Sequence, residues 1–544
     1  MSSAQRATLP VLVLLSASPA LLPTGSAPVV TARAELWAVA VAGIVALVLG
    51  ARSWQQAPLQ VAAFESPDAR QSPWPQLLVG AAALAGALSA LIGVLEVLAP
   101  QVLAGALGHG AQPSPDSSRA VGPMRQPNHL ATALLWGAVA WAVLHAQARL
   151  PKGWGTLGMA VFMLAVVLSG SRTGLLGVAI LPLWGLVDRR LPRATRILLA
   201  VAPLMAALCW WALHRWATLG GMELGVVTRF NGADGGELSS GRLAIWANSL
   251  ELIAQQPWTG VGLGHFNIAW TLTPLPGRPS EAFSHAHNLP LHLVTELGLV
   301  LGLAVCVSGL VVLGLAAKRA WAHEGPTRQA VCRRGAWIML LVVGWHSLLE
   351  YPLWYAYFSL PAALALVVCF GLDRPFKRAA RWQALILMMG GTVMLTLAAW
   401  AYADFRSIRS IYQPGRDAGP LSQRIAQGQQ ATWFSDHAHY ARATTLKPVP
   451  GQAWDEATEH AFHRAAHVLL DPRLMMAWAD ALAARDAPSD RDRARYLAAR
   501  LREFHAPSAQ AWLQACDDPQ APTSRRFVCE TPEKAWTWRD FGWP

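Results

Sequence analysis

A polar segment with two histidines stands directly before a long apolar run. His285, His287 and Asn288 belong to this segment, and His292 and Glu296 follow Asn288 at intervals of four inside the run. On a helix that interval places side chains on one face. Because polar groups within a membrane are costly, such a column faces a neighbouring helix or a wet cavity. The pattern fits a catalytic imidazole at the mouth of a membrane helix. It equally fits a histidine pair at the water interface beside a hydrogen-bonded helix contact.

Two further clusters join polar side chains to the ends of apolar runs. Gln126 and Asn128 flank a proline just before one run. An amide pair in this place can fix the hydroxyls of a ligand, whereas Asn128 can also serve as a helix N-cap. Arg172 lies in a tight connection between two runs, where it can hold an anion or extend to lipid headgroups.

Spaced glycines mark another polar region. Arg242 lies at its start, and Gly260, Gly262 and Gly264 follow. The glycine spacing is similar to that of a phosphate-binding loop, but these glycines do not follow a strand in a βαβ unit. We therefore expect a glycine-rich turn that lies on the membrane.

The last cluster brings an imidazole, a carboxylate and a phenol to the mouth of two apolar runs. These groups belong to His346, Glu350 and Tyr351. The aromatic belt of a membrane protein explains the nearby Trp354 and Tyr355. It does not explain His346 and Glu350, which lie four apart and share a helical face.

The composition identifies the elements that carry these clusters. The chain is 53% hydrophobic and only 14% charged, whereas soluble domains carry about 25% charged residues. We therefore expect an all-α, polytopic membrane protein of about eleven transmembrane helices. The first is expected to be an uncleaved span rather than a signal peptide. The expected spans are Leu9–Leu22, Leu36–Gly50, Gln76–Ala99, Leu130–His145, Gly155–Ser169, Thr173–Val187, Ile197–Leu213, Leu289–Ala317, Gly335–Leu349, Tyr355–Leu372 and Trp382–Ala403.

The charge distribution predicts the orientation. The net charge of +12 lies mostly in short loops between spans, so it indicates membrane topology rather than nucleic-acid binding. With the N-terminus in the cytoplasm, the inner loops hold most of the Lys and Arg residues, and all the polar clusters lie on the outer side. The inner positions include Arg189, Arg190, Arg193, Arg196, Arg328, Arg333 and Arg334.

Two regions are expected outside the membrane. Residues 1–403 form the transmembrane domain, in which residues 214–288 are a large outer loop, and residues 404–544 form an outer helical domain. Amphipathic pieces at Leu421–Thr432, Asp455–Leu470, Leu474–Arg485 and Arg491–Phe504 predict helical hairpins of a TPR-like kind. In an oxidising compartment Cys516 and Cys529 can pair. No spacing typical of a metal site is present, so we expect no metal.

Taken in order, these clusters resemble the O-antigen ligase/polymerase (Wzy/WaaL) superfamily. The block from His346 to Tyr355 and the polar C-terminal extension are more similar to its PglL/PilO branch, the bacterial protein O-oligosaccharyltransferases. The matching elements are Gln126-Pro127-Asn128, the turn at Arg172, Gly241-Arg242 with Trp246 and the segment Pro257–Gly262, and His287-Asn288 with Glu296-Leu297-Gly298.

The resemblance implies a GT-C-like fold in the bacterial inner membrane, with the active site and the C-terminal domain in the periplasm. It implies a glycan donor on undecaprenyl pyrophosphate, an acceptor such as a pilin or another periplasmic protein, and transfer without a metal or another cofactor. The catalytic residues implied or inferred are His287, Gln126, Tyr351 and Glu296. The substrate-binding set is Arg172, Arg242, Asn128, His285, Asn288, His346 and Glu350. In this set the two arginines match those that hold pyrophosphate in ligases. His285 is the second candidate for the role of the essential histidine.

These residues suggest a mechanism. A Ser or Thr hydroxyl of the acceptor attacks the anomeric carbon that carries the pyrophosphate, and direct displacement inverts that centre. His287 accepts the hydroxyl proton or orients the hydroxyl, and Glu296 or Glu350 holds the imidazole tautomer. Arg172 and Arg242 stabilise the charge of the departing pyrophosphate.

Three other functions stay open at this point. An O-antigen ligase or polymerase shares most of these features and differs in its acceptor, lipid A-core or a growing glycan. A transporter of polyprenyl-linked glycans would line a path with polar residues at mid-membrane, but the clusters here gather on one side and no inverted repeat is visible. A structural scaffold for the outer domain would leave the one-sided histidines and arginines unexplained.

Overall fold

The described part of the computed structural model contains helices and no strands, which confirms the all-α prediction. It divides into two compact units, residues 1–238 with 309–400 and residues 239–308 with 401–544. The described residues are 3–22, 28–29, 31–62, 72–107, 119–151, 153–221, 224–230, 241–280, 282–322, 328–372, 380–449, 455–485, 487–514 and 523–541.

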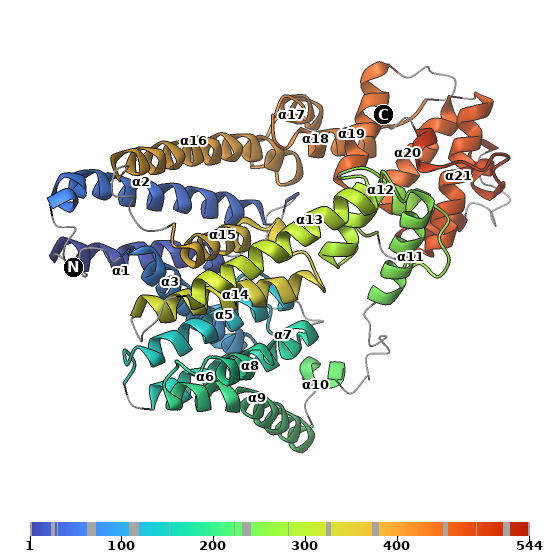
Figure 1. The fold of residues 1–544 in the computed structure, drawn as a ribbon. Helices are drawn as coiled ribbons and strands as arrows, with labels where there is room; N and C mark the ends of the chain where they lie inside the picture. The colour runs from blue at the N-terminus through green and yellow to red at the C-terminus, as the bar shows by residue number, and fades with distance from the viewer. Residues whose placement is uncertain are drawn as a thin grey trace. The chain divides into compact units, whose positions relative to one another are not determined.

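The first unit consists of long apolar helices and short connecting ones (Figure 1). Its elements are α1 Ser3–Ala17, α2 Ala32–Ala62, α3 Trp74–Leu98, α4 Pro100–Leu107, α5 Pro127–Ala146, α6 Trp154–Leu168, α7 Arg172–Gly177, α8 Ile180–Val187, α9 Arg193–Gly220, α10 Gly225–Phe230, the C-terminal part of α13 Leu289–Trp321, α14 Arg328–Ser347, α15 Ala356–Phe370 and most of α16 Ala380–Tyr412.

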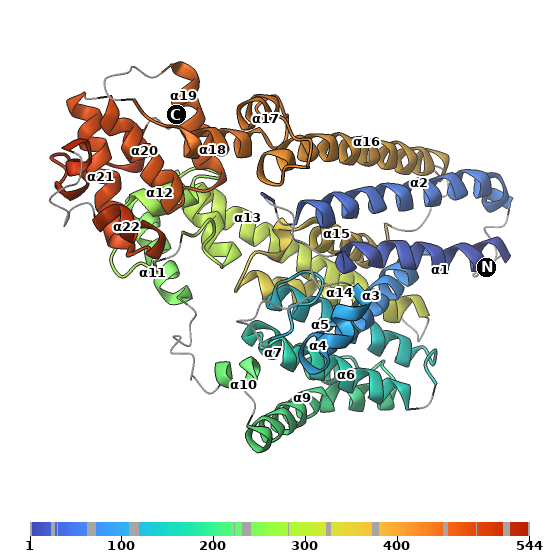
Figure 2. The ribbon, with the colours of Figure 1, turned by 180° about the vertical axis from the view of Figure 1, so that it is seen from behind.

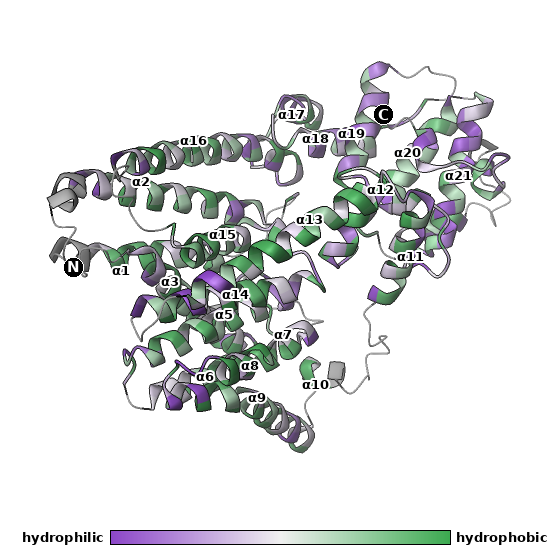
Figure 3. Ribbon diagram, viewed as in Figure 1, coloured by the Kyte–Doolittle hydropathy of each residue, from purple (hydrophilic) through white to green (hydrophobic). Residues whose placement is uncertain are grey.

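The apolar character of this unit is that of a multi-pass membrane protein. Among the described residues, six helices are long and apolar enough to cross a membrane, and four shorter apolar helices accompany them. Each of the eleven predicted spans overlaps a helix, while the count of eleven crossings stays a prediction. Figure 3 shows hydrophobic residues over most of α2, α3, α5, α6 and α9, and hydrophilic residues concentrated on the helices that follow α16.

Glycines allow the helices of this unit to approach closely. A Cβ on Gly86 of α3 would lie 2.6 Å from the Cα of Gly137 in α5. A Cβ on Gly43 of α2 would lie 2.9 Å from the carbonyl oxygen of Gly391 in α16, and these two helices run side by side in Figures 1 and 2. Small residues at such contacts are typical of packed membrane helices.

A buried ion pair lies at the N-terminal end of α14. The Nε of Arg334 is 2.6 Å from a carboxylate oxygen of Asp188, and both side chains are fully buried. The Trp184 indole donates to the same oxygen. The adjacent Arg333 is also fully buried and donates to the carbonyl of Val368. The prediction that both arginines lie in a loop is therefore wrong, because α14 begins at Arg328 and holds them inside the unit. Their place on the inner side of the membrane stays a prediction.

The second unit joins residues 239–308 to the C-terminal tail around one hydrophobic core. The Asn267 amide accepts from the backbone N–H of Leu470 at 2.7 Å, and the Tyr496 hydroxyl donates to the carbonyl of Leu272. Arg278 donates to the carbonyls of Trp270 and Thr271. The elements are α11 Arg242–Gln255, α12 Phe266–Leu272, the N-terminal part of α13, the end of α16, α17 Leu421–Gly428, α18 Ser435–Thr445, α19 Glu456–Val468, α20 Pro472–Ala484, α21 Pro488–Phe504 and α22 Gln510–Leu513.

The tail forms helices where the amphipathic pattern predicts them. The four predicted pieces correspond to α17, α19, α20 and α21, and the carboxylates of Asp455 and Asp471 cap two of these helices. The helix α18 was missed because its sequence is rich in polar residues. The TPR-like interpretation stays a prediction. Cys529 is disulfide-bonded, while Cys516 lies outside the described residues.

Candidate functional site

Asn128 links three segments of the first unit by hydrogen bonds. Its amide nitrogen donates to Glu350 at 2.9 Å, and its amide oxygen accepts from the Ser171 hydroxyl at 2.6 Å. Ser171 in turn caps α7 by accepting from the N–H of Gly174. Asn128 is the second residue of α5, so it does not act as the N-cap that the sequence also allowed. The structure thus brings Asn128 and Glu350 together, beside the start of α7.

Arg172 is the first residue of α7 and directly follows the Ser171 cap. Its side chain is half-buried. The backbone hydrogen bonds of this turn fix its position, because Ser171 also donates its N–H to the Ser169 hydroxyl at 3.2 Å. Arg172 therefore directly follows Ser171, the residue whose hydroxyl contacts Asn128.

Gln126 presents a buried acceptor at the N-cap of α5. Its amide oxygen has no hydrogen-bond partner among the described residues. Buried polar atoms in folded proteins are normally paired with protein or water. An acceptor held in this way is available for a hydroxyl of a ligand.

The loop before Gln126 is held by a carboxylate that the sequence analysis did not select. Glu96 of α3 accepts from the backbone N–H groups of Val121 and Gly122, at 2.9 and 2.8 Å. Arg119 donates to the carbonyl of Ser169 at 3.1 Å. An isolated acidic residue near the end of an apolar run was the available signal for Glu96.

His346 is buried and contacts two side chains of α5. Its Nδ1 lies 2.7 Å from the Thr132 hydroxyl, and its ring is 5.8 Å from that of His129. His129 itself lies 3.0 Å from the hydroxyl of Tyr357. His346 therefore belongs to a buried network of α5, α14 and α15 that supports the Asn128 end of α5.

Tyr351 lies in the connection between α14 and α15. Its ring stacks on that of Tyr355 at 6.1 Å between centroids, and the two phenols are hydrogen-bonded. Burial raises the pKa of Tyr351, and the adjacent Glu350 raises that pKa further. The Tyr351 phenol therefore stays protonated at neutral pH and can act as a hydrogen-bond donor.

In the second unit, α13 is interrupted at Gly298, whose φ is 77°. The carbonyls of Thr295 and Glu296 accept from the N–H groups of Val261 and Gly262, both at 2.9 Å. A Cβ on Gly298 would lie 2.2 Å from the carbonyl oxygen of Trp258, so only glycine fits. The segment Pro257–Gly262 thus packs against the interruption and forms hydrogen bonds with its backbone groups.

The Glu296 side chain is buried and supports the same loop. One carboxylate oxygen accepts from the N–H of Phe266 at 3.2 Å, and the other lies 3.6 Å from Nε2 of His292. The predicted stacking of these two side chains is confirmed. Glu296 therefore fixes the start of α12.

The two candidate histidines precede α13. His285 lies 2.7 Å from the Ser284 hydroxyl and 5.1 Å, ring to ring, from His292. His287 has a φ of 50° and stands edge-on to the Phe283 ring. A non-glycine residue with positive φ is uncommon, and such strain gathers at functional sites.

Two more predicted residues of this unit occupy helix starts. Asn288 accepts from the N–H of Leu291 at 2.9 Å and caps α13, so a structural role explains its side chain. Arg242 is the first residue of α11, after Gly241 with a φ of 73°. This helix is tied to the histidine segment, because the Trp246 indole donates to the carbonyl of Ala286 at 3.0 Å.

The predicted site residues therefore form two sets. Their meeting in one pocket stays a prediction, since the sets belong to different units. No group of acidic, histidine or cysteine side chains suited to a metal occurs in the described part of the chain. The first set is Gln126, Asn128, Arg172, His346, Glu350 and Tyr351, and the second is Arg242, His285, His287, Asn288 and Glu296.

Replacing Glu350 by alanine removes the acceptor for Asn128. The transferase activity expected from the sequence resemblance should then fall about tenfold, since a hydrogen bond to a charged group contributes roughly 1.5 kcal/mol or more. Glu350→Gln should restore most of the rate, because its amide oxygen can accept the same bond. The measurement is kcat and KM of each variant, with the loss expected in kcat. Equal impairment of both variants would mean that the charge, not the bond, is required.

Comparison with known proteins identifies related families over three stretches. Residues 157–307 match the family described as O-antigen ligase. Residues 335–517 match the C-terminal region of a family described as virulence factor membrane-bound polymerase. Residues 120–145, which include Gln126 and Asn128, match a family described as protein glycosylation ligase.

A curated relative agrees with these matches. A protein of Acinetobacter baylyi named general O-oligosaccharyltransferase is 29% identical over 259 residues. The aligned region covers 46% of this chain and 43% of the relative, so it spans less than half of either protein.

Proposed function

We propose, from the confirmed resemblance to the O-antigen ligase superfamily and its PglL-type branch, that this chain is a glycosyltransferase that glycosylates proteins. It transfers a glycan from undecaprenyl pyrophosphate to Ser or Thr hydroxyls of periplasmic proteins such as pilins. The enzyme lies in the bacterial inner membrane, with its active site and C-terminal domain in the periplasm.

One observation carries the proposal. The stretch that matches a protein glycosylation ligase contains Gln126 and Asn128, and the hydrogen bonds of Asn128 fix its place beside the Arg172 turn and Glu350. Hydrogen-bond acceptors, a guanidinium and a protonated phenol are thereby held at one end of a membrane unit. These groups suit a ligand with sugar hydroxyls and a diphosphate.

The reaction proceeds by displacement at the anomeric carbon. The acceptor oxygen forms a bond to this carbon while the bond to the pyrophosphate oxygen breaks, and the configuration inverts. His287 accepts the proton of the acceptor hydroxyl. The lipid pyrophosphate departs with the bonding electron pair.

Charge on the leaving group is stabilised by Arg172 and Arg242. Arginine binds phosphate oxygens through paired hydrogen bonds and stays charged. Tyr351 donates a hydrogen bond to the sugar or the diphosphate, and Gln126 accepts one from a sugar hydroxyl. Glu350 positions Asn128, and Glu296 positions the loop beside His292.

A ligase or a polymerase is the nearest alternative, because the matching families carry those descriptions. The acceptor separates the three reactions. Purified protein is to be incubated with lipid-linked glycan and, in parallel, with a pilin, lipid A-core or the glycan alone. We expect a mass increase of one glycan on the pilin only. Transfer to lipid A-core or chain extension would replace the proposal, and no transfer to any acceptor would overturn it.

A further inference from the structure

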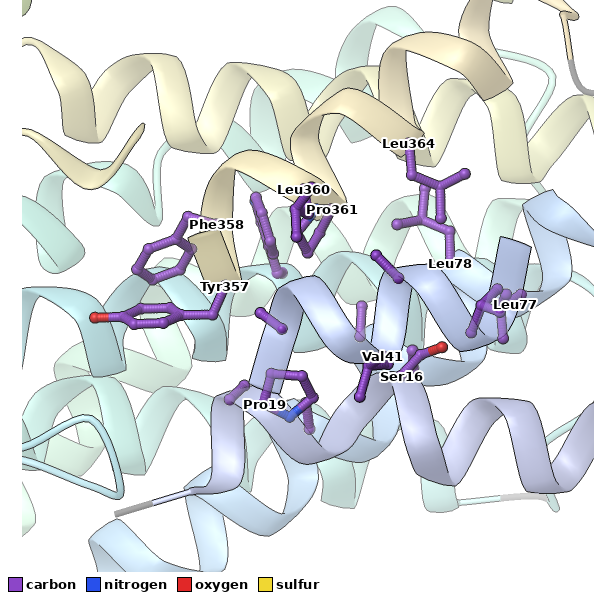
Figure 4. A pocket seen from close by; sticks show the side chains of 18 of the residues that line it. Ser16, Pro19, Val41, Leu77, Leu78, Tyr357, Phe358, Leu360, Pro361 and Leu364 are labelled. Atoms are coloured by element: carbon purple, nitrogen blue, oxygen red, sulfur yellow. The ribbon is translucent and has the colours of Figure 1, made fainter. Parts of the chain in front are cut away.

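An elongated apolar cavity of about 300 Å³ lies within the first unit. The helices α1, α2, α3, α5, α15 and α16 contribute its lining. Figure 4 shows Tyr357 and Phe358 at one end of this lining and Leu77 and Leu364 at the other. Pockets for small molecules typically measure ~300–1,000 Å³, so this cavity lies at the lower end of that range and has room for only part of a long chain.

The lining is suited to hydrocarbon. Aliphatic and aromatic side chains dominate it. The polar group of Trp136 is engaged elsewhere, because its indole donates to the carbonyl of Met339 at 2.8 Å. Apart from Ser16, the lining therefore offers few hydrogen bonds, and a polar ligand would lose its hydration without compensation.

The space exists because small residues face it from neighbouring helices. Ala38 and Ala42 of α2 and Ala81, Ala82 and Ala85 of α3 line the cavity. Elsewhere on α2 the chain packs tightly through its glycines. The cavity therefore results from the small residues on these helix faces, while α2 packs closely against its neighbours elsewhere.

One end of the cavity adjoins the candidate site. The hydroxyl of Tyr357, a lining residue, lies 3.0 Å from His129, which is the next residue after Asn128. Met124 also lines the cavity and precedes Gln126 by two positions. A chain in the cavity would therefore place an attached headgroup beside the polar residues of α5.

We propose that this cavity holds part of the prenyl chain of the lipid-linked donor. The identity of the lipid rests on the proposed function. A prenyl chain fits because it is long, branched with methyl groups and without polar atoms, while its pyrophosphate needs polar groups at one end. The headgroup end is where Gln126, Asn128 and Arg172 lie in this unit.

A sugar-free probe tests the cavity without requiring transfer. The full-length protein in phosphatidylcholine nanodiscs is to be irradiated with a polyprenyl pyrophosphate that carries a diazirine on its chain. We expect the label on the peptides of α2 and α3 that line the cavity. Ala42→Phe and Ala82→Phe should lower the labelling at least tenfold. Ala207→Phe, the same change at an exposed position of α9, should keep it.

Competition identifies the occupant. Unlabelled undecaprenyl pyrophosphate should displace the probe, and phosphatidylglycerol at the same concentration should not. Equal displacement of the probe by both lipids would overturn the proposal, and so would labelling of wild-type protein outside the lining. Both results come from wild-type protein, so they do not depend on whether the two phenylalanine variants fold. If the probe labels the lining but the protein transfers no glycan, the proposed function is wrong. The assignment of the cavity to a prenyl chain would still hold in that case.

Discussion

Replacing His287 by asparagine is expected to lower glycan transfer by about 10²–10⁴-fold, the usual contribution of a general base. Asparagine is the appropriate substitution because the backbone at this position has a φ of 50°. Asparagine tolerates this left-handed backbone conformation, whereas for alanine it costs roughly 1–2 kcal/mol. The asparagine variant therefore removes the imidazole with little backbone strain, and lipid-linked donor should still bind.

A second histidine provides a matched control. His505 has a φ of 48° at the C-cap of α21, and its side chain is exposed. His505→Asn should transfer glycan at the wild-type rate and unfold at the wild-type temperature. The measurement is the initial rate of glycan transfer together with donor binding for both variants. A near-normal rate in His287→Asn would exclude this histidine as the base and make His285 the next candidate.

Replacing Asp188 by alanine is expected to destabilise the first unit by about 3–5 kcal/mol, as for other buried ion pairs that lose one member. Asp188 and Arg334 are both buried, and the terminal nitrogens of Arg334 have no hydrogen-bond partner in the described part of the chain. Without the carboxylate, the guanidinium stays buried with its charge uncompensated. The apparent unfolding temperature in detergent should fall sharply.

The double variant Asp188→Ala with Arg334→Met separates charge from packing. Replacing both members of a buried pair by apolar groups is often neutral, so we expect most of the lost stability to return. Both variants are to be followed by thermal aggregation of the detergent-solubilised protein. An unchanged unfolding temperature in the single variant would show that this pair contributes little to stability.

The helices of this protein were largely predictable from its sequence, because hydropathy determines which segments can cross a membrane. The buried arginines of α14 were not. Arg333 and Arg334 look like inner-loop charges in a sequence, and only the carboxylate of Asp188, far away in the chain, explains the burial of Arg334. Pairings of this kind depend on tertiary packing, which local composition does not encode.

The candidate site was predictable in part. The pairing of His292 with Glu296 follows from helical spacing. The contacts of Asn128 with Ser171 and Glu350 join segments that are distant in the sequence, so no spacing rule could give them. Glu96 was passed over because its role is to bind backbone N–H groups, a role that side-chain chemistry alone does not indicate.

The interruption of α13 at Gly298 indicates where the hydrocarbon core of the bilayer ends along this helix. Non-helical backbone is tolerated at membrane depth only against protein or water, and here the segment Pro257–Gly262 supplies the contacts. The uninterrupted helix from Leu299 to Trp321 is roughly 33 Å long, which alone matches a hydrocarbon thickness of about 30 Å. The fatty-acid region of the bilayer can therefore end at the interruption. His292 and Glu296 would then lie at headgroup level, outside the hydrocarbon core of the bilayer.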